Sequence, residues 1–166
     1  SWEALIHLWP NFLSYLLSFV MLGIYWGNHH HLIHTIHEVR GGILWANLHL
    51  LFWLSLMPFA TAWMGENNFS KVTLILFCVV STMAGLAYFI LLTTIRRCTP
   101  PSQKLQQVLA KQSKKGAMSV IFYVVAIAGA FIHPAVAAFF IVLVAVWWLL
   151  PDRNIEKAID HNEHHS

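Results

Sequence analysis

The chain has 166 residues, of which 58% are hydrophobic and only 10% are charged. A water-soluble domain carries about 25% charged residues, so this composition excludes an ordinary soluble enzyme or binding module and favours an integral membrane protein. The formal net charge is only +3 and six of the ten basic residues lie in one stretch, 96-115, so the charge indicates membrane topology and no nucleic-acid partner.

Long stretches without charged residues predict membrane-spanning helices. A bilayer core about 30 Å thick needs roughly 20 apolar helical residues. The last charge-free stretch is too long for one helix, and Pro134 interrupts it, so we interpret it as a helical hairpin. The predicted spans, all within one transmembrane domain of residues 1-151, are 10-37, 42-64, 72-95, 117-132 and 135-150. We therefore predict an all-α, polytopic membrane helical bundle with five spanning helices.

The first predicted helix, 10-37, carries a polar stripe. At 100° per residue its members share one face, and they are Asn11, Ser14, Ser18, Tyr25 and His29. Lipid offers such groups no partner, so the stripe should face protein or a water-filled cavity. Beside it, Gly23 and Gly27 form a G-x-x-x-G pattern that allows another helix backbone to come close. Both a hydrated pathway and an ordinary helix-helix contact agree with this pattern.

Five histidines gather at the end of the same helix, namely His29, His30, His31, His34 and His37. Spacing of i, i+4 can chelate zinc, but no Asp or Glu lies inside any predicted span. Membrane di-iron oxygenases use several histidine boxes, and a haem site would need a second histidine such as His49 on the next helix. We rank interhelical hydrogen bonding first, pH sensing second and metal binding third, and we predict no metal or cofactor.

The second predicted helix, 42-64, contains two informative residues. Asn47 lies in the same half of the membrane as His29, and a hydrogen bond between the two side chains would satisfy both. Pro58 cannot donate a backbone hydrogen bond, so it leaves the carbonyl of Leu54 free and should kink the helix.

The stretch between the third and fourth spans predicts the orientation. Residues 96-115 contain six basic residues and no acidic one, and the positive-inside rule places such a loop in the cytoplasm. Within it, 97-115, we expect a short amphipathic helix lying on anionic lipid. The polar C-terminal tail, 152-166, should then also be cytoplasmic and Ser1 should lie outside. We assign the apolar hairpin that follows the loop to scaffold.

Two segments, 14-34 (SYLLSFVMLGIYWGNHHHLIH) and 44-65 (LWANLHLLFWLSLMPFATAWMG), resemble the transmembrane protein 175 family, the endosomal and lysosomal potassium channels and their prokaryotic relatives. The resemblance covers residues 9-96 and continues more loosely through the last two spans. Its motifs are the pair Ser18-Phe19, the W-x-x-H-H of Trp26, His29 and His30, the amide Asn47 and the pair Pro58-Phe59.

The resemblance implies six helices per repeat and four prokaryotic subunits around a central pore. It also implies conduction that prefers potassium, without the carbonyl filter of ordinary potassium channels. In that family the first helix carries an R-x-x-x-F-S-D signature and lines the pore with an apolar constriction. This sequence lacks the signature, so its five spans resemble helices two to six. We expect the pore-lining residues on the absent first helix. We also expect that helix to cover the polar stripe and the G-x-x-x-G.

The resemblance implies that four residues support the pore helix through hydrogen bonds, and they are Trp26, His29, His30 and Asn47. Ser18, Gly23, Gly27 and Pro58 are expected to pack helices together. The sequence is therefore identified as a homotetrameric potassium-channel subunit of a prokaryotic plasma membrane, not an enzyme, with potassium as the permeant ion. Two alternatives stay open: a membrane redox protein that binds haem or iron through its histidine cluster, and a non-conducting membrane scaffold.

Overall fold

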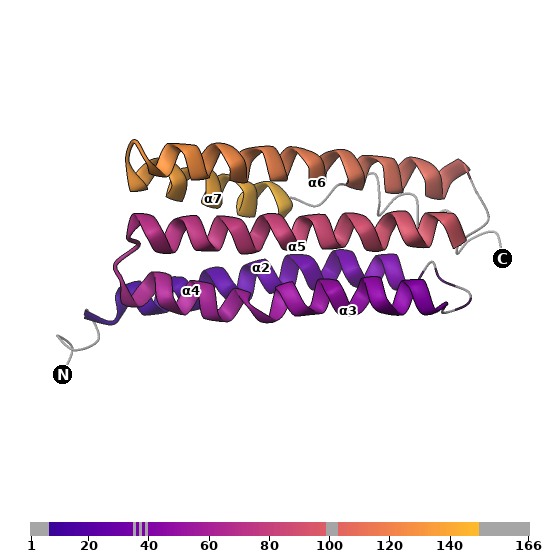
Figure 1. Ribbon diagram of the computed structural model, residues 1–166, viewed down its shortest axis with the longest axis horizontal. Helices are drawn as coiled ribbons and strands as arrows, with labels where there is room; N and C mark the ends of the chain where they lie inside the picture. Colours follow the sequence, from indigo (N-terminus) through magenta and orange to yellow (C-terminus); the bar gives the residue numbers. More distant parts are fainter. Residues whose placement is uncertain (1–6, 35, 37, 39, 99–102, 150–166) are drawn as a thin grey trace.

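The computed structural model describes residues 7-34, 36, 38, 40-98 and 103-149, and in this part of the chain every regular element is an α-helix. The helices are α2 (Trp9–Ile33), α3 (Gly41–Ser55), α4 (Met57–Glu66), α5 (Lys71–Cys98), α6 (Gln103–Ala130) and α7 (Pro134–Leu149). They lie side by side along one long axis, as an elongated bundle (Figure 1). The predicted all-α helical bundle is confirmed.

α5 is the centre of this bundle. It lies between the α6-α7 pair and the group formed by α2, α3 and α4 (Figure 1), and it packs against α3, α4, α6 and α7. Its small residues Ala84 and Ala87 are fully buried, which lets neighbouring helices approach closely. A Cβ placed on Gly85 would lie 3.5 Å from a methyl group of Val120 on α6. The small side chains of α5 therefore set its distance from α6.

Three helices in the described part are long and apolar enough to cross a membrane: Gly41–Glu66, Lys71–Cys98 and Leu109–Ala130. Pro134–Leu149 is also apolar but shorter. α2 has 25 residues, but polar side chains and histidines interrupt its apolar surface. These helices make the chain a polytopic integral membrane protein.

The second of the predicted helices is broken in two. α3 ends at Ser55 and α4 begins at Met57, with Leu56 between them as the cap residue of both helices, and Pro58 lies in the first turn of α4. A proline there removes a backbone donor, which is the physical reason for the predicted kink. Thr61 donates its hydroxyl to the carbonyls of Met57 and Pro58, at 2.9 and 3.1 Å. The Thr61 hydroxyl thus gives these two carbonyls, next to the break, a side-chain hydrogen-bond donor.

The structure differs from the sequence-based expectation in the basic stretch 97-115. We expected a short helix lying on the membrane surface and separate from the span 117-132, whereas α6 runs without interruption from Gln103 to Ala130. The reason is that Leu109, Gln112 and Ser119 are all buried, so one continuous face of α6 packs against α5. The first turns of α6 therefore extend the spanning helix. Residues 99-102 and the tail 152-166 lie outside the described residues.

α6 and α7 form the predicted hairpin. The turn at 131-133 is closed by backbone hydrogen bonds from Ile132 and His133 to the carbonyl of Gly129, both 3.0 Å long. A Cβ on Gly129 would lie 2.5 Å from a methyl group of Val136, so only glycine fits where the two helices approach each other.

Candidate functional site

The side chains of His29 on α2 and Asn47 on α3 meet where the two helices end and begin. The ring nitrogen Nε2 of His29 lies 2.6 Å from Oδ1 of Asn47, and both residues are half-buried. A carbonyl oxygen can only accept, so Nε2–H donates and this bond fixes the tautomer of the ring. The sequence predicts this pairing, and the structure brings the two side chains together.

Trp26 lies beside this bond rather than within it. Its ring stacks against His29 and His30, with centroids 6.4 and 5.9 Å apart. The indole itself is 67% exposed, so most of its surface faces away from the described helices. Trp26 therefore shields the imidazoles on the outer face of α2.

His30 belongs to a different pair. Its Nε2 lies 3.1 Å from Nε2 of His34, one turn further along α2, and both side chains are exposed. The four residues expected to form one hydrogen-bond network thus divide into a bond between His29 and Asn47, the stacked ring of Trp26, and His30, which turns toward His34. His37 lies outside the described residues.

Most of the polar stripe of α2 packs against the chain's own helices, which differs from the expectation that an absent helix covers it, whereas Asn11 is exposed. Ser14 is 1% exposed, and a Cβ on Gly65 of α4 would lie 2.6 Å from its Oγ. Ser18 is also buried, and together with Thr61 it lines a groove between α2 and α4. Small residues on α4 let its backbone come close to α2, which is why these hydroxyls are covered from within the chain.

The G-x-x-x-G face of α2 is different. A Cβ placed on Gly23 or Gly27 would meet no described atom within 4 Å. The neighbouring side chains Phe19 and Trp26 are each 67% exposed. Within the described residues, no helix packs on this face.

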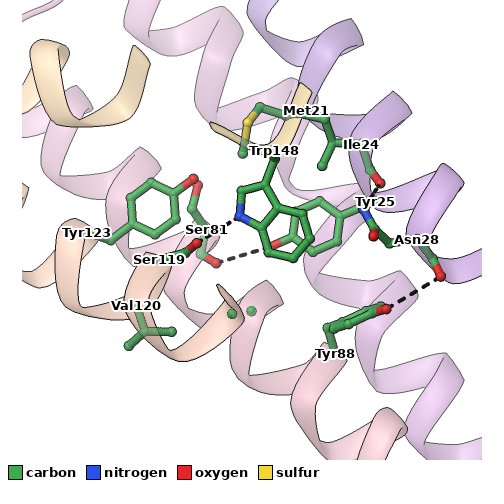
Figure 2. A pocket seen from close by; sticks show the side chains of 12 residues that line it. Met21, Ile24, Tyr25, Asn28, Ser81, Tyr88, Ser119, Val120, Tyr123 and Trp148 are labelled. Carbon is green, nitrogen blue, oxygen red and sulfur yellow. Dashed lines mark hydrogen bonds between the residues drawn. The ribbon is translucent and has the colours of Figure 1, made fainter. Parts of the chain in front are cut away.

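The sequence did not predict the partly open cavity where α2, α5, α6 and α7 meet (Figure 2). Its volume is about 40 Å³, room for roughly three water molecules. α2 packs against α4 but reaches α5 mainly through long side chains, and this wider spacing leaves the space. The lining includes Tyr25, Ser81, Tyr88, Ser119, Tyr123 and Trp148. The signal that could have found it is the presence of three tyrosines in otherwise apolar helices.

Hydrogen bonds around this cavity connect separate helices. Trp148 donates its indole N–H to Oγ of Ser119 at 2.8 Å, and the Tyr25 hydroxyl lies 3.5 Å from the carbonyl oxygen of Ser81 (Figure 2). Figure 2 also shows the hydroxyl of Tyr123 pointing toward Ser81. The lining is aromatic, aliphatic and hydroxylic, with no charged side chain among its members. Such a lining suits water and helix-helix contacts better than an ion.

A redox centre needs a set of metal-ligating side chains. The described residues contain no group of three or more His, Cys, Asp or Glu side chains that could enclose a metal. His49, the histidine that could pair with α2 across a haem, accepts a hydrogen bond of 3.0 Å from the indole of Trp53 on its own helix. Among the described residues, the hydrogen bond that His49 makes thus lies within α3 and not with a histidine of α2.

A family model and individual relatives both match this chain to potassium channels. Residues 1–58 match the family model described as the endosomal/lysosomal potassium channel TMEM175. The chain is 46% identical over 162 residues to a potassium channel of Chryseobacterium sp. (strain P1-3), and the match covers 98% of this chain and 84% of that protein. It is 30% identical over 91 residues to a potassium channel of Streptomyces collinus, covering 52% of this chain and 44% of that protein. No solved structure matches the chain.

Proposed function

Because the chain belongs to the family of the endosomal/lysosomal potassium channel TMEM175, we propose that it is a subunit of a potassium-preferring cation channel. The observation that carries this proposal is the 46% identity to a bacterial potassium channel over nearly the whole chain. Conduction is passive and passes through a central pore formed by four copies. The permeant ion is potassium, and the channel needs no cofactor.

The His29–Asn47 bond supports a positioning role for this part of the subunit. A buried or half-buried polar pair that is fully satisfied fixes the relative orientation of the two helices that carry it. In this proposal the pair holds the end of α2 against the start of α3, and Trp26 shields it from the outer face. These residues orient the pore helix and do not contact the ion.

The pore itself is assigned to a helix that carries the R-x-x-x-F-S-D signature, a motif not found in these 166 residues. We propose that this helix packs on the α2 face formed by Gly23 and Gly27. What supports this is the open space beside both glycines, which allows a second backbone to approach closely. Ions would lose part of their hydration as they pass a ring of apolar side chains, one from each subunit.

We propose that the protein lies in a prokaryotic plasma membrane, with residues 96-115 and the C-terminus in the cytoplasm. The support is the charge of the stretch 96-115, from the end of α5 into α6, which holds six basic residues and no acidic ones. Within it, Arg96 donates to the side-chain oxygen of Gln106 at 2.9 Å, so α6 starts close to the end of α5.

The experiment that tests this function is ion flux into liposomes that contain the purified full-length protein. A potassium gradient should drive uptake that is faster than sodium uptake, and planar-bilayer recordings should show the corresponding current. The 46%-identical bacterial channel serves as the positive control in the same lipid. If the control conducts while this protein passes no potassium at any voltage, the proposed function is wrong and a non-conducting scaffold is favoured.

A further inference from the structure

The outer face of α2 carries two imidazoles whose nitrogens converge. His30 and His34 are four residues apart, so their side chains lie one above the other on the helix. Their Nε2 atoms are 3.1 Å apart, and their ring centroids are 4.4 Å apart with the planes nearly perpendicular. Both residues are exposed. The backbone of α2 alone therefore places the two nitrogens next to each other.

The separation of the nitrogens suits two ligands on one metal ion. Zinc binds imidazole nitrogen at about 2.0–2.1 Å. Two such ligands at coordination angles between 90° and the tetrahedral angle would lie roughly 2.9–3.3 Å apart. The observed distance falls inside this interval. Each ring can present a lone pair at Nε2 when its proton is on Nδ1, so two neutral rings can bind an ion without releasing a proton.

The position also gives an ion access from water. His30 and His31 lie in the last turn of α2, and His34 is its C-terminal capping residue. The helix has 25 residues, which at 1.5 Å per residue makes it about 37 Å long, longer than the hydrocarbon core. Its last turn can therefore reach the headgroup level. The ring of Trp26 stacks beside His30 and provides an apolar wall on one side.

We propose that His30 and His34 form a site for one borderline divalent transition-metal ion, with Zn²⁺ as the typical ligand and water completing its coordination. Imidazole suits zinc, copper and nickel, whereas calcium and magnesium prefer oxygen ligands. Because the described residues offer no third ligand beside this pair, the site is open and exchangeable. The bound ion links two successive turns of the helix and so stabilises the end of α2, next to the His29–Asn47 bond.

His31 provides a matched control. It belongs to the same turn, and its ring centroid lies 6.1 Å from that of His30, but no contact joins its nitrogens to the pair. The tail histidines His161, His164 and His165 could bind metal independently, so the experiment uses a background in which all three are replaced by Gln. The side chains changed on α2, His30, His31 and His34, are all exposed, and monodisperse elution in detergent verifies that each variant is folded.

Isothermal titration of ZnCl2 into the purified background protein measures the affinity, and visible absorption of Co²⁺ reports imidazole coordination directly. We expect about one ion per chain in the background protein. Loss of one of only two protein ligands in His30→Gln or His34→Gln should weaken binding by about tenfold or more, while His31→Gln stays within about twofold. Zinc should also raise the melting temperature of the background protein and not of His30→Gln.

Two results would overturn the proposal. One is a background protein that binds neither Zn²⁺ nor Co²⁺. The other is unchanged affinity in both His30→Gln and His34→Gln. These measurements use binding and unfolding only, so their outcome is independent of whether the protein conducts ions.

Discussion

The phenol of Tyr88 on α5 donates a hydrogen bond of 3.0 Å to the side-chain oxygen of Gln112 on α6, and both residues are buried. The amide nitrogen of Gln112 in turn lies 3.3 Å from the side-chain oxygen of Asn28 on α2. Three helices that are far apart in sequence are thus joined by one short chain of polar groups. In a low-dielectric interior a satisfied network of this kind fixes the relative position of its helices.

Tyr88→Phe should destabilise the protein because it leaves a buried amide oxygen of Gln112 without its donor. The expected cost is about 1–3 kcal/mol of unfolding free energy, measured by thermal unfolding in detergent. Tyr15→Phe is the matched control, since Tyr15 is 70% exposed. An equal loss in both variants would mean that the Tyr88–Gln112 bond makes no specific contribution.

His29→Ala or Asn47→Ala should lower tetramer stability more than it alters ion preference. Each substitution leaves one half-buried polar group unpaired, which costs about 1–3 kcal/mol, while the proposed pore surface is untouched. Tetramer dissociation temperature and reversal potential under mixed potassium and sodium are the two measurements. The double variant should show a non-additive loss. A large shift in reversal potential with unchanged tetramer stability would contradict the positioning role.

Gly65→Ala should separate α2 from α4. The added Cβ would lie 2.6 Å from Ser14 Oγ and 3.0 Å from the backbone oxygen of Pro10, so the helix backbone must shift. Overpacking of this kind costs about 1–3 kcal/mol. Gly116→Ala on α6 is the control, because a Cβ there meets nothing within 4 Å and alanine favours the helix. A Gly65→Ala protein as stable as Gly116→Ala would show that the close contact is absent.

Gly23→Leu should interfere with assembly while sparing the fold of the described helices. The residue has open space around it within the chain, so the larger side chain meets no described helix. If the Gly23–Gly27 face packs on another helix, the bulky side chain would prevent that close approach. Size-exclusion chromatography with light scattering should show fewer tetramers with unchanged helicity. Val79→Leu, an enlargement on the exposed side of α5, is the control.

Cys98 allows the proposed orientation to be tested. It lies at the end of α5 and is half-buried, whereas Cys78 is fully buried within the same helix. A membrane-impermeant maleimide should label Cys98 in inside-out vesicles and not in intact cells, and Cys98→Ser should abolish the label. Labelling of intact cells that depends on Cys98 would reverse the proposed topology.

The sequence predicts the structure correctly where one physical cause has one structural result. Charge-free stretches of about 20 residues predict helices, and α5 accordingly occupies Lys71–Cys98 where 72-95 was expected. Pro58 predicts a break that the structure places at Leu56. The pairing of His29 with Asn47 followed from the need of two polar groups for partners within an apolar region.

It failed where one pattern agrees with two environments. An amphipathic stretch such as 97-115 can lie on a membrane or pack against a neighbouring helix, and only the tertiary structure shows that Leu109 and Gln112 are buried. The polar stripe of α2 likewise identifies no partner, so Gly65 on α4 could not be recognised as the residue that covers Ser14. The tyrosine-lined cavity depends on helix spacing, which single-residue patterns do not encode.

The break at Leu56 divides the contacts of α2 between two helices, α3 and α4. α4 contacts the first half of α2 through Gly65 and Ser14, and α3 contacts the far end of α2 through Asn47 and His29. Because these two contacts lie on opposite sides of the break, each of the two helices fixes one end of α2, and the angle between α3 and α4 therefore determines how α2 is oriented.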